Sequence, residues 1–181
     1  LQGAETLVIP SIPSDSLDIN ITNKINAAAY PFLKFSMHTK DDSIKTPSQL
    51  KRWQAIYSGV PECALNPEIE FSFYNDTVAE GEDLSLKIAI ENIGDYDMDS
   101  LLIAYSIITP NYSVIPIPYP RQGKLLVDSV MISELTFSSK GLDGNYQLFI
   151  EVNPNNDQLE QFHFNNIGTL SFHVTGDDLN P

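Results

Sequence analysis

The chain contains one cysteine and few basic residues. Cys63 is the only cysteine among 181 residues, so no disulfide bond can form within the chain. Ten Lys and Arg residues stand against 24 Asp and Glu residues, which gives a formal net charge of -14 at pH 7. Such an acidic surface repels a polyanion, which gains no free energy from counterion release on it. The composition therefore argues against nucleic acid as a partner.

Long apolar runs are missing as well. A run such as Leu101–Ile108 is far shorter than the roughly 20 apolar residues that cross a bilayer, so we expect no membrane insertion by this chain. The chain begins at Leu1 without a basic segment and apolar stretch, and it ends at Pro181, which predicts an internal fragment of a longer protein. Hydrophobic residues nevertheless make up 42% of the chain, enough to form a folded core.

Helical periodicity is absent after residue 66, where apolar side chains recur at every second position. The clearest case is Leu84, Leu86, Ile88 and Ile90 between mostly polar neighbours. This period places alternate side chains on opposite faces of a strand, and turn-forming Gly, Asn, Asp and Pro residues separate such runs. Similar alternation occurs in four further runs: Ile69/Phe71/Phe73, Leu101/Ile103/Tyr105/Ile107, Tyr146/Leu148/Ile150/Val152 and Leu170/Phe172/Val174. The pattern predicts an all-β fold, an Ig-like antiparallel β-sandwich of about seven strands.

Two segments depart from the simple alternation. In 130–137 the apolar residues change parity between Ile132 and Leu135, which predicts a bulge or bend in that strand. The segment 111–120 holds three prolines within five positions, so it is expected at an irregular edge of a sheet and not at its centre.

The pattern also predicts where the chain divides. Residues 1–60 are predicted to be a β-rich segment, either a small companion sheet or the tail of a preceding β-domain. Residues 61–67 hold two prolines and Cys63 and are predicted to be a linker. Residues 68–176 then form the sandwich, and 177–181 lead to a following domain. The alternation in the first segment covers Leu17/Ile19/Ile21 and Leu33/Phe35/Met37.

The order of turn motifs after residue 66 resembles that of a known family. The motifs are Val78–Asp83 before the run Leu84–Glu91, then Glu91–Gly94, Gly144–Tyr146, Glu151–Pro154, Leu159–Glu160 and Phe164–Asn166. In this order they resemble the bacterial cell-adhesion-related, Ig-like module abbreviated CARDB, over residues 66–176. The resemblance implies a non-catalytic sandwich domain, whose Asn, Asp and Glu residues bond the backbone of neighbouring turns.

The residues before the sandwich resemble a region of very large secreted Bacteroidetes proteins. The matching residues are Tyr30–Lys34, Arg52–Gln54, Tyr57, Val60–Glu62 and Ala64–Pro67. Some of those proteins carry a gingipain-like cysteine peptidase domain and leave the cell by type IX secretion. Five triplets also resemble the Asp-Ser/Thr-apolar acceptor of Bacteroidetes O-glycosylation: Asp15–Leu17, Asp42–Ile44, Asp76–Val78, Asp99–Leu101 and Asp128–Val130. The resemblance implies a secreted or cell-surface location.

The function expected from these features is a structural or adhesive one. We expect a spacer or docking domain of a larger exported bacterial protein, with the neighbouring domains of the same polypeptide as its first partners and a glycan or cell-surface protein as a further one. The alternative is a carbohydrate- or calcium-dependent binding module that accompanies a peptidase or glycosidase domain. No cofactor is expected beyond a structural calcium ion.

A catalytic cysteine is not expected. A thiol nucleophile needs a nearby histidine to deprotonate it, and His38, His163 and His173 are scattered along the chain without such a context. His173 lies on the parity that faces away from the core, so a solvated strand position is expected for it. The sequence therefore predicts no catalytic residue.

Calcium and carbohydrate remain the ligand classes to weigh. Asn153, Asn155, Asp157 and Glu160 place oxygen atoms at near-alternate loop positions, as hard Ca²⁺ prefers. The alternative for these residues is structural capping of a turn. Asp95, Asp97 and Asp99 show the same spacing but run into a strand, where their side chains should diverge. For carbohydrate, the candidate aromatic residues are Trp53, Tyr96, Tyr112 and Tyr119, whose alternative role is packing in the core or between domains.

Overall fold

The computed structural model describes residues 6–12, 18–21, 24–26, 30, 32–38, 40, 42–45 and 53–176. The chain divides into two compact units, Leu1–Ala55 and Ile56–Pro181. Among the described residues, no helix has the length and apolar character of a membrane span.

The first unit contains no strand within its described residues. The strand expected around Leu33, Phe35 and Met37 is therefore not formed, and Leu17 lies outside the described residues. Alternation alone does not make a strand, because the backbone N–H and C=O groups also need a neighbouring strand to bond. Phe32 is 85% exposed, and the rings of Phe35 and Trp53 lie 5.0 Å apart. The β-rich character of residues 1–60 stays a prediction.

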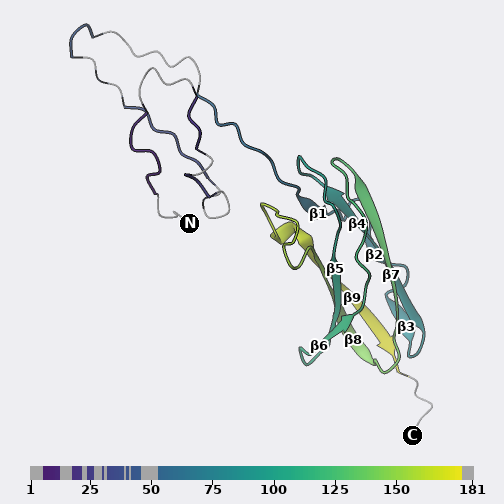
Figure 1. The fold of residues 1–181 in the computed structure, drawn as a ribbon. Helices are drawn as coiled ribbons and strands as arrows, with labels where there is room; N and C mark the ends of the chain where they lie inside the picture. The colour runs from purple at the N-terminus through teal and green to yellow at the C-terminus, as the bar shows by residue number, and fades with distance from the viewer. Residues whose placement is uncertain are drawn as a thin grey trace. The chain divides into compact units, whose positions relative to one another are not determined.

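The second unit is a sandwich of two β-sheets (Figure 1), which confirms the predicted fold class. Its described residues, 56–176, form nine strands, two more than the roughly seven expected from sequence alternation. One sheet contains β1 (Cys63–Leu65), β4 (Asp83–Asn92), β2 (Phe71–Phe73) and β7 (Val130–Ser138), in which β4 pairs with the other three. The other has the order β3 (Thr77–Ala79), β9 (Ile167–Thr175), β8 (Gly144–Val152), β5 (Ile103–Ile108) and β6 (Val114–Ile117). A short 3₁₀ helix, η1 (Phe164–Asn166), precedes β9.

The linker predicted at 61–67 is wrong, because it contains β1. Cys63 pairs with Asn92 and Leu65 pairs with Ile90 in an antiparallel ladder, so β1 belongs to the sandwich. The three residues of β1 are all apolar (Cys63, Ala64 and Leu65), so no alternation with polar residues marked the strand in the sequence. The compact unit accordingly begins at Ile56, before the predicted start of the sandwich.

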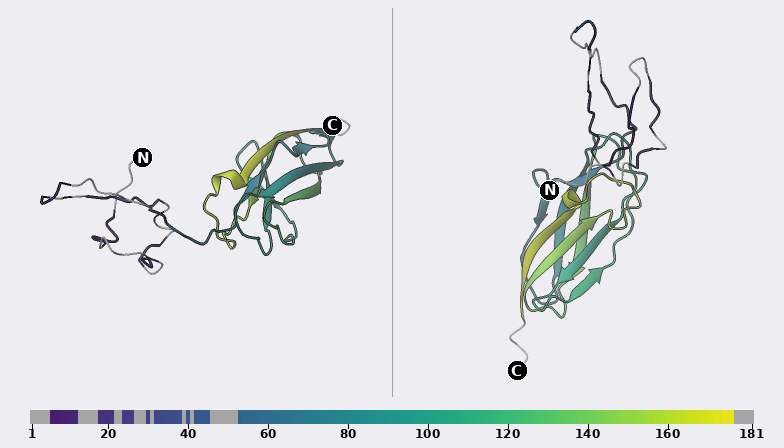
Figure 2. Two further views of the ribbon diagram at one scale, coloured as in Figure 1. Left: turned by 90° about the horizontal axis from the view of Figure 1, so that it is seen from above. Right: turned by 90° about the vertical axis from the view of Figure 1, so that its left-hand side faces the viewer.

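The core lies between the two sheets and is formed by the apolar side chains at the alternate strand positions that the sequence predicted. Leu84, Leu86, Ile88 and Ile90 of β4 are fully buried. Figure 2 shows the two layers from other directions, with β8 beside β9 in the second sheet. That sheet contributes mainly β-branched, Leu and aromatic side chains. Each fully buried Leu or Ile stabilises the fold by about 1.5–3 kcal/mol, so this parity determines which face of each strand is buried.

Strand β7 has no bulge, contrary to the prediction from its change of parity. Its register with β4 runs unbroken from Asp83↔Ser138 to Glu91↔Val130. The core face of β7 carries Leu135, Phe137 and the buried Ser133, while Ile132 is exposed on the outer face. The change of parity therefore reflects a polar residue on the core side and apolar residues on the outer side of one regular strand.

Ser133 is buried because it bonds two tyrosines. The Tyr105 hydroxyl lies 2.9 Å from Ser133 Oγ, which lies 2.8 Å from the Tyr119 hydroxyl. The Tyr119 hydroxyl in turn donates to the carbonyl oxygen of Glu134 at 3.0 Å. Burial also raises the pKa of Tyr105 well above its ordinary value, so this phenol stays protonated and can donate.

The proline-rich segment forms an edge strand, as predicted. β6 pairs only with β5, and Pro116 lies opposite Ser106. Thr109 N donates to Ser113 O at 2.9 Å, and in an antiparallel ladder hydrogen-bonded and non-hydrogen-bonded residue pairs alternate. Counting along β6 from this bond, Pro116 falls in a non-hydrogen-bonded pair, so its backbone groups point away from β5. Proline therefore removes an outward donor without breaking the ladder, which hinders pairing with a further strand.

Candidate functional site

Two carboxylates join the start of the sandwich to the loop that leads into β9. Glu62, directly before β1, is buried and accepts hydrogen bonds on both carboxylate oxygens. Oε2 accepts from the backbone N–H groups of Gln161 at 2.8 Å and Phe162 at 3.2 Å. Oε1 accepts from Asn165 Nδ2 at 3.0 Å. One side chain thus fixes a loop about 100 residues further along the chain.

Glu160 makes the reciprocal set of bonds from that loop. Its Oε1 accepts from the backbone N–H of Cys63 at 2.6 Å, and its Oε2 accepts from Asn166 Nδ2 at 2.8 Å. Oε2 also accepts from Nδ2 of the buried Asn153. The Cys63 thiol donates to Asn166 Oδ1 at 3.4 Å. Each carboxylate therefore holds groups on the segment that carries the other.

Asn92 extends these contacts to the end of β4. Its Oδ1 accepts from the N–H groups of Gly94 at 3.0 Å and Glu62 at 3.4 Å. Its Nδ2 donates to the carbonyl oxygens of Tyr96 at 2.8 Å and Leu125 at 3.2 Å. A Cβ atom at Gly94 would lie 2.5 Å from the backbone N of Glu62, so only glycine allows this close approach. We call the whole set the Glu62–Glu160 network: Glu62, Cys63, Asn92, Asn153, Glu160, Asn165 and Asn166.

The motif residues singled out from the sequence are thus largely bonded to one another. The motifs were expected to bond the backbone of neighbouring turns, and four of their residues form hydrogen bonds to backbone groups or to one another: Asn92, Asn153, Glu160 and Asn166. Glu62 was not recognised from sequence, because it lies in the segment interpreted as a linker and its partners are remote in the chain.

The four calcium candidates do not converge on one point. Asn153 and Glu160 bond each other, but Asp157 forms an ion pair with Arg121, with 2.5 Å between Oδ2 and the guanidinium. Asn155 is exposed in the turn. The described residues contain no group of three or more His, Cys, Asp or Glu side chains arranged to hold a metal ion. The arrangement does not fit a calcium ion bound by all four.

The second acidic loop is likewise divided among separate contacts. Asp97 Oδ1 accepts from Val127 N at 2.9 Å, and Asp99 Oδ1 lies 3.3 Å from Lys124 Nζ. Asp95 lies against Gly59, where a Cβ atom would meet its Oδ2 at 2.7 Å. The three side chains diverge, as their place before a strand predicts.

Cys63 is unsuited to act as a nucleophile. Its thiol is fully buried, and burial followed by the adjacent Glu160 carboxylate raises the pKa of this thiol far above its ordinary value. The reactive form of cysteine is the thiolate, which this environment disfavours. The thiol bonds Asn166 and not an imidazole.

The aromatic candidates for carbohydrate have different surroundings, and Tyr96 is 49% exposed. Tyr119 packs edge-on against Tyr105, with 5.0 Å between ring centroids, and its hydroxyl is bonded. Trp53 lies in the first unit, whereas Tyr112 lies in the turn before β6 and is 87% exposed. An exposed pair that the sequence analysis missed is Phe162 and Phe164, with ring centroids 5.6 Å apart. Phe162 lies in the loop before η1 and Phe164 begins η1, so no strand pattern marked the pair.

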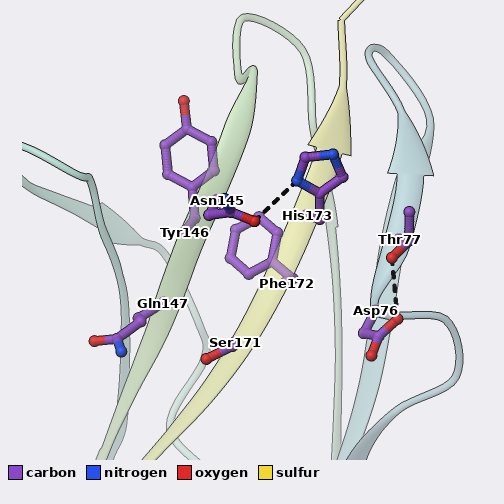
Figure 3. Close-up of a pocket in the computed structure, with 8 residues that line it drawn as sticks. All are labelled: Asp76, Thr77, Asn145, Tyr146, Gln147, Ser171, Phe172 and His173. Carbon is purple, nitrogen blue, oxygen red and sulfur yellow. Dashed lines mark hydrogen bonds between the residues drawn. The ribbon is translucent and has the colours of Figure 1, made fainter.

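A shallow groove lies along β3, β9 and β8 (Figure 3). It is lined by Asp76, Thr77, Asn145, Tyr146, Gln147, Ser171, Phe172 and His173. Asn145, His173 and Thr77 form one row across the three strands. His173 Nδ1 lies 3.0 Å from Asn145 Oδ1, and the Thr77 hydroxyl donates to Asp76 at 3.1 Å. The outward position expected for His173 is confirmed.

A solved structure has a similar fold, although no protein-family model and no curated protein sequence matches the chain. The CARDB domain of the PF1109 protein from Pyrococcus furiosus, solved in complex with di-metal ions, is 17% identical. The match covers 65% of this chain and 96% of that domain, with a TM-score of 0.52. A solution structure of the same domain is 14% identical, with 66% and 98% coverage and a TM-score of 0.47.

A third match is the 272–376 domain of a Methanosarcina acetivorans protein whose name assigns it to the cell surface. It is 18% identical, with 67% and 97% coverage and a TM-score of 0.45. At these identities the first match supports the architecture alone, that of a CARDB-like, Ig-like sandwich.

Proposed function

We propose that the second unit is a non-catalytic structural or adhesive module, a spacer or docking domain of a larger exported bacterial protein. The observation that supports this is the Glu62–Glu160 network, which uses the polar motif residues to hold the module together. Glu62 and Glu160 each accept three hydrogen bonds within the sandwich. Because their oxygen atoms are bonded within the sandwich, these two side chains stabilise the module and are not free to bind a ligand.

The position of the network suits a domain under tension. The chain enters the sandwich at Glu62 and leaves after β9, which ends at Thr175. Tension on the entering chain reaches β1 and, through Glu160 and the loop 161–166, the start of β9. Near the other end, β3 pairs in parallel with β9, from Thr77↔His173 to Ala79↔Thr175. A ladder pulled along its strands loads its hydrogen bonds together, so it resists more than one opened bond by bond.

The parent protein is proposed from the sequence motifs. The CARDB resemblance and the Asp-Ser/Thr-apolar triplets support an extracellular location, and residues 30–34, 52–54 and 60–67 support a large Bacteroidetes protein of the type IX secretion route. A gingipain-like peptidase in that parent would lie outside this chain. The partners of the module would then be the neighbouring domains of the same polypeptide.

Pulling on the two ends of the full 181-residue chain tests the spacer role. We expect the second unit to unfold in one main event, at a clearly lower force in the double variant Glu62→Gln/Glu160→Gln. Glu151→Gln is the matched control, because Glu151 lies on the outer face of β8 without a hydrogen bond or ion pair among the described residues. Equal unfolding forces for the double variant and the wild type would contradict the proposal.

A further inference from the structure

The groove of Figure 3 includes Gln147 and Ser171 on the outer face of the five-stranded sheet. Gln147 and Phe149 follow each other on the outer side of β8, since Leu148 and Ile150 between and beyond them are buried. Phe149 pairs with Thr169 of β9 on one side and with Ser106 of β5 on the other. A half-buried aromatic ring thus lies between two hydroxyl-bearing positions, about 7 Å along the strand from Gln147.

Two polar side chains of this face, those of Gln147 and Ser171, form no hydrogen bond within the described part of the sandwich. In Figure 3 the side chains of Gln147 and Ser171 project from adjacent strands. Neither side chain has a hydrogen bond partner among residues 53–176, in contrast to Asn145, which is bonded to His173. The face therefore offers an amide and a hydroxyl, both able to donate and to accept.

The charge of this face also restricts the ligand. The positions next to Gln147 and Ser171 carry no charge, and the nearest carboxylate along the outer side of β8 is Glu151, two residues beyond Phe149. No basic side chain lines the groove to attract an anion, and its one carboxylate, Asp76, accepts from Thr77. A neutral ligand with many hydroxyl groups and an apolar ring face meets these groups without desolvating an unpaired charge.

We propose that this outer face of β8 and β9 binds a neutral oligosaccharide, with a sugar ring on Phe149 and its hydroxyl groups bonded to Gln147 and Ser171. The aromatic body supplies apolar contact area and the polar groups fix the orientation, as in other small-ligand sites. The site differs from the loop tyrosines suggested by the sequence. It also goes beyond the spacer role and does not rest on it.

Affinity electrophoresis of the full chain in gels that contain β-glucan, mannan or xylan tests the proposal. We expect retardation by at least one of these neutral polysaccharides. Gln147→Ala should weaken that binding about five-fold, as expected for one lost hydrogen bond. Phe149→Leu should weaken it at least as much, because it removes the ring while keeping an apolar side chain.

Phe164→Leu is the matched control, since it removes a ring that is 76% exposed and lies outside the groove. We expect this variant to bind like the wild type, and thermal melts to show that all three variants stay folded. Because Gln147 is exposed in its strand, its variant keeps the test valid if Phe149→Leu fails to fold. Three results would each overturn the proposal: no retardation by any neutral polysaccharide, retardation that survives both groove variants, or retardation by the polyanion polygalacturonate alone. None of them bears on the unfolding force expected of a spacer.

Discussion

The change Glu160→Gln tests whether the Glu62–Glu160 network stabilises the fold. Glu160 accepts from Cys63 N at 2.6 Å, from Asn166 Nδ2 at 2.8 Å and from Asn153 Nδ2. Glutamine keeps the shape of the side chain, but it loses the charge and replaces one accepting oxygen by an NH₂ group. At least one donor of the network then faces another donor.

The expected loss of stability follows from these bonds. A hydrogen bond to a charged group contributes about 1.5–3 kcal/mol, and a buried donor left without a partner costs a further ~1–3 kcal/mol. Because the loop can relax in part, we expect the free energy of unfolding to fall by about 3 kcal/mol in total. For a domain of this size that lowers Tm by roughly 10 °C.

Urea unfolding of the full chain, followed by circular dichroism, measures this change. Glu151→Gln carries the same change of charge on the outer face of β8 and should alter the stability by less than about 0.5 kcal/mol. Glu62→Gln should resemble Glu160→Gln. Together the two should cost less than their sum, because both carboxylates hold the same pair of segments. If Glu160→Gln were as harmless as Glu151→Gln, the network would be incidental to stability.

Four further predictions concern other parts of the sandwich. Ser133→Val should lower the free energy of unfolding by about 1–3 kcal/mol although it adds an apolar side chain to the core, because it leaves the Tyr105 hydroxyl unpaired. The double variant Ser133→Val/Tyr105→Phe should regain part of this stability, since it lacks that hydroxyl, and urea unfolding compares the two variants. Gly94→Ala should destabilise strongly because its Cβ meets backbone at 2.5 Å, whereas Gly123→Ala, with no atom within 4 Å, should be nearly neutral in a thermal melt. Cys63 should react with a disulfide reagent at pH 8 only as the protein unfolds, and a fast reaction in the folded state would refute this. Because burial raises the pKa of the Cys63 thiol, the stability that this thiol contributes is fully present below the ordinary thiol pKa and should be lost progressively as the pH rises above it. Millimolar calcium should leave Tm unchanged, since the four candidate ligands do not converge, and a rise would reveal a site specific to the folded form.

The apolar alternation of the sequence was sufficient to predict the sandwich. Leu84, Leu86, Ile88 and Ile90 are buried on one face of β4 because side chains alternate along any extended strand, whatever lies around it. The prolines around Pro116 predicted an edge strand, again from local sequence alone, because proline has no N–H to donate and a central strand needs donors toward both neighbours. The short strands β1 and β3 were not predicted: β1 is apolar throughout, and β3 has one large apolar residue, Val78, so neither shows the alternation that Ile69, Phe71 and Phe73 show around β2.

The remaining features were decided by tertiary contacts. The sequence of β7 suggested a bulge, yet the unbroken ladder with β4 and the hydroxyls of two tyrosines make Ser133 the residue on the core face. Glu62 appeared to lie in a linker, and only folding brings it to Gln161 and Asn165, about 100 residues away. Local sequence determines which face of a strand is apolar. Which polar groups bond one another depends on how distant segments pack. For this reason the motif residues form a network within the protein, whereas Gln147 and Ser171 stay on its outer face without a hydrogen-bond partner in residues 53–176.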